Sequence, residues 1–273
     1  IDLQSKQIKP LTQHFYHYGF QRVHYLSNGD YLLTGADFFE KSNPWKARKP
    51  ENCQVWVLNK DLKKPPTPLG ITLKEGIAIS RNSLKIAWVQ DPNMYYAEVV
   101  YDDGKPKLVN KKVLFSQKDL PEPVKDWKLE PQDFRPTLDN ELIFNAHFES
   151  IIYEAEVMGF NFETGEIKSY SKRPDRYDEP ETIFPDGKST LVESNRHRPK
   201  YKNYKSWNLI DLYRLQLDGS GKMERLTYFN DNENYKASNP VVSPDGKLLA
   251  FQYAQLDEVT GIGHGILIMD LSK

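Results

Sequence analysis

Several features that would identify a protein class directly are scarce in this sequence. Its 273 residues include one cysteine, Cys53, which excludes a disulfide framework and a thiolate metal cluster. Lysine plus arginine number 37 and aspartate plus glutamate 38, so the net charge of −1 creates no global field for nucleic acid. No apolar run approaches the roughly 18 residues of a membrane span. We therefore expect no nucleic-acid partner and no membrane span, and any charged site must be local. The first residue is Ile1 rather than Met, and we expect a processed form or an excised piece.

The composition favours many short strands over helices. Aromatic residues make up 12% of the chain, with 16 Tyr, and there are 18 Pro. Aromatic side chains suit strands, and proline suits turns. No window sustains the apolar spacing of three and four residues that a helix requires beyond a turn or two. The sequence therefore predicts an all-β fold.

Two segments repeat each other around a Pro-Asp-Gly turn. Residues 182–192 and 238–251 each place an apolar run on both sides of this turn, which predicts a β-hairpin because Gly accepts the positive φ of a tight turn. Further hairpin turns follow at regular intervals. With Asn82 marking the second turn, the successive spacings are 54, 57, 47 and 59 residues. This is slightly longer than the period of a four-stranded propeller blade. The five predicted turns are Asn28-Gly29, Arg81-Asn82, Asp139-Asn140, Asp186-Gly187 and Asp245-Gly246.

The two ends of the chain complement each other. Residues 265–271 read as the third strand of a blade with no fourth strand after it, whereas Ile8–Thr12 resembles the fourth-strand segment Met223–Thr227. An open array would leave bare sheet edges, so the N-terminal strand is expected to close the ring. We predict a single domain over 1–273: a five-bladed β-propeller of four-stranded antiparallel blades. Because residues 1–3 already repeat residues 269–271, the alternative is five blades of a larger propeller. The predicted blades span 13–70, 71–117, 126–173, 177–230, and 235–273 together with 1–12.

The Pro-Asp-Gly hairpins, with Arg225-Leu226-Thr227 closing a blade, resemble the TolB-like (WD-like) β-propeller repeat family. Blades four and five match its signature in detail, whereas residues 80–83 and 138–141 depart from it. The resemblance implies a periplasmic or secreted propeller that binds a partner or ligand. Such repeats also precede the hydrolase domain of prolyl oligopeptidase-like enzymes, but this chain has no Gly-x-Ser-x-Gly motif.

In a propeller, the first strand of each blade lines the central channel. Aligning the hairpins on their turns predicts a column of polar residues at the channel mouth, with Arg22 and Asn239 in the neighbouring column. Such a ring could bind sugar hydroxyls, ordered waters or a cation; alternatively, its residues are polar only because the channel is wet. We expect no cofactor, with a divalent cation held by Glu75, Asp133 and Glu179 as the alternative. The predicted column is Gln21, Glu75, Gln132, Glu179 and Ser238.

A long loop at residues 195–207 interleaves basic and aromatic residues, including Arg196, His197 and Trp207. Planar rings stack on sugars and Arg pairs with carboxylates, so the loop suits an acidic glycan. The alternative is a loop whose rings anchor it to its neighbour. His147, His197 and His264 could share one rim and bind a transition metal, although they come from different blades.

We therefore predict an extracytoplasmic, monomeric binding protein that recognises a glycan or a protein partner on its top face. The alternative is a carbohydrate-active lyase or hydrolase, with Glu75, Glu179 or His264 as catalytic candidates. Glu179 and Glu181 could work as an acid–base pair because residues i and i+2 of a strand face the same side.

Overall fold

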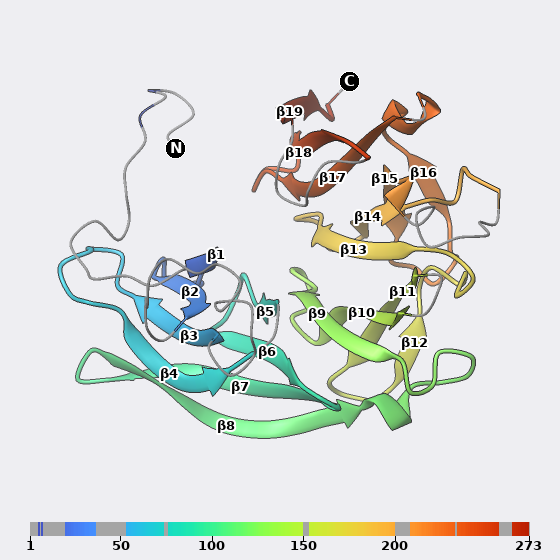
Figure 1. Cartoon of the computed structure of the whole chain (residues 1–273). Helices are drawn as coiled ribbons and strands as arrows, with labels where there is room; N and C mark the ends of the chain where they lie inside the picture. Colours follow the sequence, from blue (N-terminus) through green and yellow to red (C-terminus); the bar gives the residue numbers. More distant parts are fainter. Residues whose placement is uncertain are drawn as a thin grey trace.

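The structure of the chain is a computed structural model. It describes residues 5, 7, 20–36, 53–73, 76–149, 153–199, 208–232, 234–256 and 264–272. These residues form five antiparallel sheets, the blades, arranged around one axis (Figure 1). The predicted all-β fold and five-bladed propeller are confirmed. The division of the chain into one domain stays a prediction.

Each blade is formed by strands that are consecutive in the sequence. Blade 1 contains β1 (Phe20–Tyr25), β2 (Tyr31–Ala36), β3 (Cys53–Leu58) and β4 (Thr67–Thr72). Blade 2 contains β5 (Ile77–Ile79), β6 (Lys85–Gln90), β7 (Asn93–Asp102) and β8 (Lys105–Ser116). Blade 3 contains β9 (Lys128–Phe134), β10 (Glu141–Glu149), β11 (Tyr153–Asn161) and β12 (Ile167–Ser169). Blade 4 contains β13 (Asp178–Ile183), β14 (Ser189–Ser194), β15 (Asp211–Gln216) and β16 (Met223–Arg225).

Blade 5 has three strands within the described residues: β17 (Tyr235–Val242), β18 (Leu248–Gln255) and β19 (Gly265–Asp270). Its predicted fourth strand falls on residues 1–12. Of these, the structure describes only Ser5 and Gln7, so the predicted closure of the ring lies outside the described residues. The short 3-10 helices η2 (Gln117–Asp119) and η4 (Phe229–Asp231) lie between blades 2 and 3 and between blades 4 and 5. Within the described part of the chain, no helix is long and apolar enough to cross a membrane.

The Pro-Asp-Gly turns have the geometry that the sequence predicts. Gly187 and Gly246 have φ values of 68° and 73°, in the left-handed region that Gly enters without strain. The Gly187 N–H donates to the Phe184 carbonyl oxygen at 2.8 Å. The Asp186 carboxylate accepts a hydrogen bond from the Lys188 N–H at 3.0 Å, and this second hydrogen bond also stabilises the turn. These turns determine which residues of β13 and β14 lie opposite each other.

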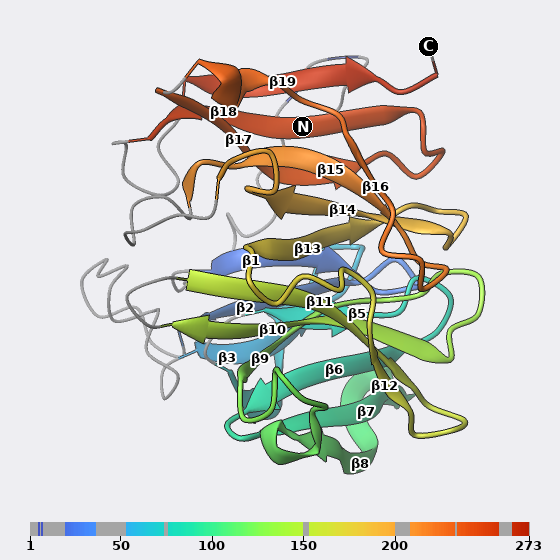
Figure 2. The ribbon, with the colours of Figure 1, turned by 90° about the vertical axis from the view of Figure 1, so that its right-hand side faces the viewer.

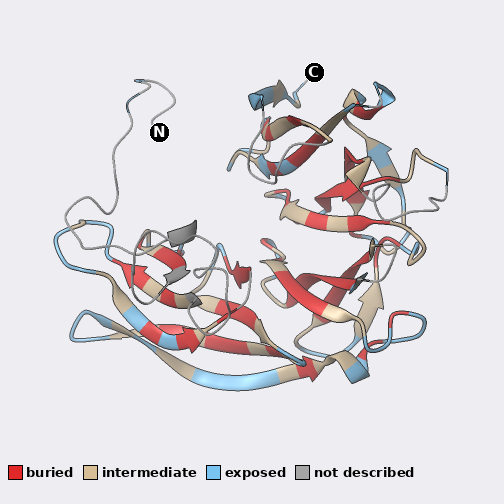
Figure 3. Cartoon of the chain, in the orientation of Figure 1, coloured by how far each residue is buried: buried red, intermediate tan, exposed pale blue. Residues whose placement is uncertain are grey.

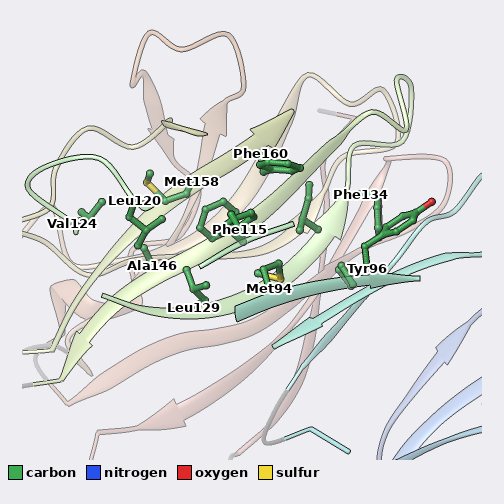
Figure 4. Close-up of a cluster of buried hydrophobic side chains, with 14 residues drawn as sticks. Met94, Tyr96, Phe115, Leu120, Val124, Leu129, Phe134, Ala146, Met158 and Phe160 are labelled. Carbon is green, nitrogen blue, oxygen red and sulfur yellow. The ribbon is translucent and has the colours of Figure 1, made fainter. Parts of the chain in front are cut away.

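Apolar side chains fill the space between consecutive blades. Figure 4 shows the cluster between blades 2 and 3, where the Phe115 ring lies 5.0 Å from the rings of both Phe144 and Phe160. Similar clusters join blades 1 and 2, blades 3 and 4, and blades 4 and 5. Burying one such side chain contributes about 1.5–3 kcal/mol, so these clusters supply most of the folding energy. Figure 3 shows this buried layer running through the blades.

The blades stack with their first strands toward the axis. The side view in Figure 2 shows the sheets of blades 4 and 5 lying one on the other. The innermost strands are β1, β5, β9, β13 and β17, and the space they enclose is the central channel. The fold therefore presents one strand of each blade to a common cavity.

Candidate functional site

The central channel contains a cavity of about 980 Å³. All five innermost strands contribute to its wall, as expected for first strands of propeller blades. The volume lies within the range of small-molecule sites, which is roughly 300–1,000 Å³. Its charged and amide lining residues are Arg81, Asn82, Glu130, Gln132, Asp133, Glu179, Glu181, Glu193, Asn208, Lys236, Asn239 and Gln252.

A β-bulge recurs at the same place in the first strand of blades 3, 4 and 5. In blade 4, Glu179 lies opposite Glu193, and the register then shifts between Pro180 and Thr182. Pro has no N–H for the ladder, so a bulge accommodates it. The extra residue bends the strand and re-aims side chains, which here brings polar groups to the channel.

The recurring bulge defines one layer of polar residues around the channel, which we call the polar layer. It consists of three cross-strand pairs: Glu130 with Asn145, Glu179 with Glu193, and Ser238 with Gln252, all of which except Asn145 line the cavity. The alignment on turns predicted Gln132 at the position that Glu130 occupies, because the blade 3 turn is longer. The repeated Glu-Pro dipeptides at 130–131 and 179–180 are the sequence signal that would have given the correct register. Gln132 also lines the cavity, at the bulge.

Three glutamates of blade 4 converge on the channel. One carboxylate oxygen from each of Glu179, Glu181 and Glu193 lies within 4.8 Å of the other two. The Tyr177 hydroxyl donates a hydrogen bond to Glu179. Such oxygen ligands suit a hard divalent cation, and among the described residues no other group of His, Cys, Asp or Glu has this geometry. Sequence reasoning identified Glu179 and Glu181 but missed Glu193, which comes from the second strand.

Burial changes the proton affinity of this cluster. Glu193 is 5% exposed, and its carboxylate accepts a hydrogen bond from the Asn239 N–H at 2.5 Å. Burial raises the pKa of Glu193 to about 7, against the opposing effects of that hydrogen bond and of the Lys236 charge. Burial also raises the pKa of the Tyr177 hydroxyl, and the negative charges of Glu179 and Glu193 add to the effect. The cluster therefore contains a carboxyl group that titrates near neutral pH.

A second acidic group lies on the wall formed by blades 2 and 3. Arg81 Nη2 is 2.9 Å from Asp133 Oδ2. Burial raises the pKa of Asp133 to about 6, although the Arg81 charge and its hydrogen bond lower it. Among the described residues that line the cavity, carboxylates number five and lysine and arginine side chains number two.

Three exposed apolar or aromatic side chains belong to the cavity lining. Val23 and Tyr25 of blade 1 and Val241 of blade 5 line the cavity and are 47%, 67% and 56% exposed. The Tyr25 ring lies 5.1 Å from the Tyr31 ring. We call Val23, Tyr25 and Val241 the apolar wall. Large side chains this exposed inside a cavity offer a surface for the apolar part of a ligand.

Some of the predicted site residues line the cavity, and others do not. Gln132, Glu179 and Asn239 line the cavity, and so does Ser238 of the predicted column. Glu75 and Trp207 lie outside the described residues. Gln21 and Arg22 belong to β1, and for these two residues the structure describes the backbone alone.

In the described part of the 195–207 loop, residues 195–199, the basic side chains contact neighbouring residues of the protein. The Arg196 guanidinium forms a fork with the Asp178 carboxylate, with Nη2 to Oδ2 at 2.7 Å and Nε to Oδ1 at 3.0 Å. Arg198 Nε donates to Asn230 Oδ1 at 2.7 Å. His197 lies between the Tyr213 hydroxyl at 3.1 Å and Asn230 Oδ1 at 2.8 Å. None of the three lines the cavity.

The structure does not bring His147, His197 and His264 together. All three lie in the described part of the chain, and no metal-ligand group there contains any of them. Instead, His147 stacks on Tyr153 with ring centroids 5.5 Å apart, and His264 lies 5.8 Å from the Tyr253 ring. Each of the three histidines packs against an aromatic ring of its own neighbourhood.

Comparison with known proteins supports the fold. No family model and no curated protein sequence matches the chain. The structure is similar to TolB from Acinetobacter baumannii, with a TM-score of 0.57, 19% identity and 88% of this chain covered. The chain spans about half the length of that protein, of which 50% is covered. Matches also include the β-propeller domain of the Trilobed protease from Pyrococcus furiosus (TM-score 0.49, 10% identity, covering 93% of this chain and 71% of that one). Oligogalacturonate lyase from Vibrio parahaemolyticus matches with a TM-score of 0.45 and 12% identity, covering 93% and 75% of the two chains.

The chain is a β-propeller protein with a TolB-like fold. At this level of identity the likeness concerns the fold, so the function is argued from the channel itself.

Proposed function

We propose that the protein is an extracytoplasmic binding protein that recognises a glycan in its central channel. The observation that carries the proposal is the pairing of the polar layer with the apolar wall in one cavity of about 980 Å³. A sugar has hydroxyl groups that carboxylates and amides bind, and C–H faces that pack on aromatic rings. The residues that line the cavity offer both kinds of contact.

The polar layer favours ligand binding over a purely structural channel. Blade 4 places Glu179 directly opposite Glu193, so two carboxyl groups lie side by side on the cavity wall. Each can accept hydrogen bonds from the hydroxyl groups of a ligand.

The proposed compartment is periplasmic or secreted. It rests on the resemblance of the Pro-Asp-Gly hairpins to the TolB-like repeat. Cell fractionation of the native host, with detection of this chain by antibody, tests it. Recovery of the protein with the cytoplasmic fraction would contradict this part of the proposal.

A glycan-binding measurement tests the site. An array of neutral and charged oligosaccharides identifies a ligand, and titration calorimetry measures its affinity for the full chain. The double variant Glu179→Gln/Gln252→Ala is expected to bind at least about tenfold more weakly, because each change removes contacts worth about 1 kcal/mol. Glu163→Gln, on an exposed turn of blade 3, is the matched control and should bind as the wild type does. Equal affinity of the channel variant and the wild type, or no binding to any glycan, would overturn the proposal.

A second candidate function is glycoside hydrolysis. The observation that favours it is the spacing of the Glu179 and Glu193 carboxylate oxygens, which lie within 4.8 Å of each other. Retaining glycosidases hold two carboxyl groups about 5–5.5 Å apart. Glu193, with a pKa of about 7, would be the general acid and Glu179 the nucleophile. Release of reducing ends from a bound glycan, abolished in Glu193→Gln while binding persists, would establish this function over simple binding.

A further inference from the structure

We propose that a second copy of this chain pairs with β19 along its outer edge, so that the blade 5 sheets of the two copies join into one antiparallel sheet. β19 (Gly265–Asp270) is the outermost strand of blade 5 in the described part of the chain (Figures 1 and 2). Within the described residues it pairs with β18 alone. The dimer is independent of the proposed function, and it replaces the monomer expected from the sequence.

Three consecutive large apolar residues of β19 are exposed. The exposed fractions are 77% for Ile266, 38% for Leu267 and 59% for Ile268, and the described part of the chain has no other run of exposed large apolar neighbours. Successive side chains of a strand point to opposite faces of the sheet. An uncovered face would expose only alternate residues, so this run indicates that the edge of the sheet is open. An open edge presents backbone N–H and C=O groups that can pair with another strand.

The outer strands of the other blades have features that oppose edge pairing. β4 contains Pro68, and β8 contains Pro106 and four lysines. β12 and β16 are only three residues long. Proline, lysine and short length all hinder the association of one sheet edge with another. β19 has six residues and contains no proline, lysine or arginine, so it lacks each of these protections.

The sequence of β19 is complementary to itself in one antiparallel register. With a two-fold axis through Leu267, Ile266 of each copy lies opposite Ile268 of the other. Such β-branched cross-strand pairs stabilise a sheet. The same register places Asp270 opposite His264 of the other copy, so the two carboxylates do not face each other. Moving the axis to Ile268 would instead place Ile266 opposite Asp270.

This self-complementarity identifies the occupant of the edge. A two-fold interface brings the same residues of both copies together, so the strand must fit itself. Pairing with residues 8–12 or with a different protein makes no such demand on the β19 sequence. The channel remains accessible in the dimer, because β17 faces the channel and β19 lies two strands away from it.

Sedimentation velocity tests the proposal on the wild-type chain. An interface made by one pair of strands is small, so we expect a reversible monomer–dimer equilibrium with a micromolar dissociation constant. Concentrations from about 1 μM to about 500 μM cover that range. The sedimentation coefficient should rise with concentration toward the value for two chains.

Two variants at the two-fold axis test the register. Leu267→Lys and Leu267→Glu each place like charges opposite each other, so each should weaken dimerisation at least about tenfold. An equal mixture of the two variants should recover a dimer, because opposite charges then face each other. Val113→Lys, at a 49% exposed position of the outer strand β8, is the matched control and should dimerise as the wild type does. Urea unfolding shows whether each variant is folded.

Each contrary result has a defined meaning. A wild-type chain that stays monomeric would overturn the proposal, and deletion of residues 1–12 then identifies the alternative. Dimerisation of the shortened chain alone would show that these residues cover β19, whereas a monomeric shortened chain would leave the edge to a different protein. A dimer that persists in both Leu267 variants would place the contact elsewhere, and a monomeric mixture of the two would exclude pairing through Leu267. Either result would also overturn the proposal.

Discussion

The Glu193 carboxylate accepts a 2.5 Å hydrogen bond from the backbone N–H of Asn239, and this contact joins the second strand of blade 4 to the first strand of blade 5. Asn239 has a φ of 51°, in the left-handed region that few residues other than Gly and Asn adopt. It lies in the bulge between Ser238 and Val241. A buried acid therefore holds the backbone in the conformation that forms the polar layer of blade 5.

This contact makes stability depend on pH. The pKa of Glu193 is raised from its ordinary value of 4.5 to about 7 in the folded state. The folded state thus binds this proton more tightly, and the stability it contributes is complete below pH 4.5 and lost as the pH rises through about 7. Glu193→Gln keeps an acceptor for the Asn239 N–H but cannot ionise. Between about pH 5 and 8, we expect the wild type to lose more unfolding free energy than the variant, by on the order of 3 kcal/mol.

Urea unfolding at both pH values measures this difference. Glu163→Gln, the exposed control, should follow the wild-type pH dependence. Parallel curves for the wild type and Glu193→Gln would show that Glu193 is ionised with an ordinary pKa in the folded protein.

We predict that Arg196 stabilises the folded state and does not bind the ligand. Its guanidinium forms a fork with Asp178, which is fully buried, and donates to the Ser171 carbonyl oxygen. Burial raises the pKa of Asp178, and the Arg196 charge and hydrogen bonds oppose that shift. Arg196→Ala leaves the carboxylate without its cation, so we expect a loss of about 3–5 kcal/mol in unfolding free energy.

The double variant Asp178→Asn/Arg196→Met removes both charges together and should lose less stability than Arg196→Ala, because no buried charge is left without its partner. Chemical denaturation of the three proteins gives the comparison. Glycan affinity at a temperature where Arg196→Ala remains folded should equal that of the wild type. A tenfold loss of affinity in a folded Arg196→Ala variant would show that Arg196 takes part in ligand binding.

The sequence predicted the fold because turn chemistry is local. Asp186-Gly187 and Asp245-Gly246 specify their hairpins independently of the surrounding packing. Because each blade contains one of the five predicted turns, their number gives the number of blades. The site was only partly predictable, because it depends on register. Glu179 was found on the first strand, but Glu193 faces the channel only through its place opposite Glu179, and Glu130 was missed because the blade 3 turn is longer.

The sequence also did not predict which charged side chains are paired within the protein. The basic loop suggested an anion site, yet Arg196 and Arg198 are matched by Asp178 and Asn230, residues 18 and 32 positions away. Such partners are visible only in three dimensions.

Replacing Gly by Ala at two turns should lower the unfolding free energy by unequal amounts. Gly187 has a φ of +68°, and a Cβ there would lie 2.4 Å from Thr137 Oγ1 of blade 3. Gly219 has a φ of +82° with nothing within 4 Å. Gly219→Ala should lower the unfolding free energy by about 1 kcal/mol, because of the backbone conformation alone. Gly187→Ala should lower the unfolding free energy by about 1–3 kcal/mol more than Gly219→Ala does, because Thr137 must move.

Thermal or urea unfolding of both variants checks the difference. Adding Thr137→Ala should recover part of the loss in Gly187→Ala and none in Gly219→Ala. Equal costs at the two positions would mean that the blade 3 to blade 4 contact at this turn is looser than the structure shows.

The outer edge of blade 5 gives a test of how the ring closes. Within the described residues, β19 pairs with β18 alone, and Ile266 on it is 77% exposed. Blade 4 has β16 at the corresponding place, and residues 8–12 resemble β16 in sequence. If they pair with β19, the amides of β19 that point away from β18 are hydrogen-bonded and exchange slowly. Deleting residues 1–12 should then speed hydrogen exchange at alternate amides of β19 by at least about a hundredfold and leave the amides bonded to β18 nearly unchanged. Exchange followed by NMR resolves single amides, and a deletion that leaves every β19 rate unaltered would show that another segment or partner covers this edge.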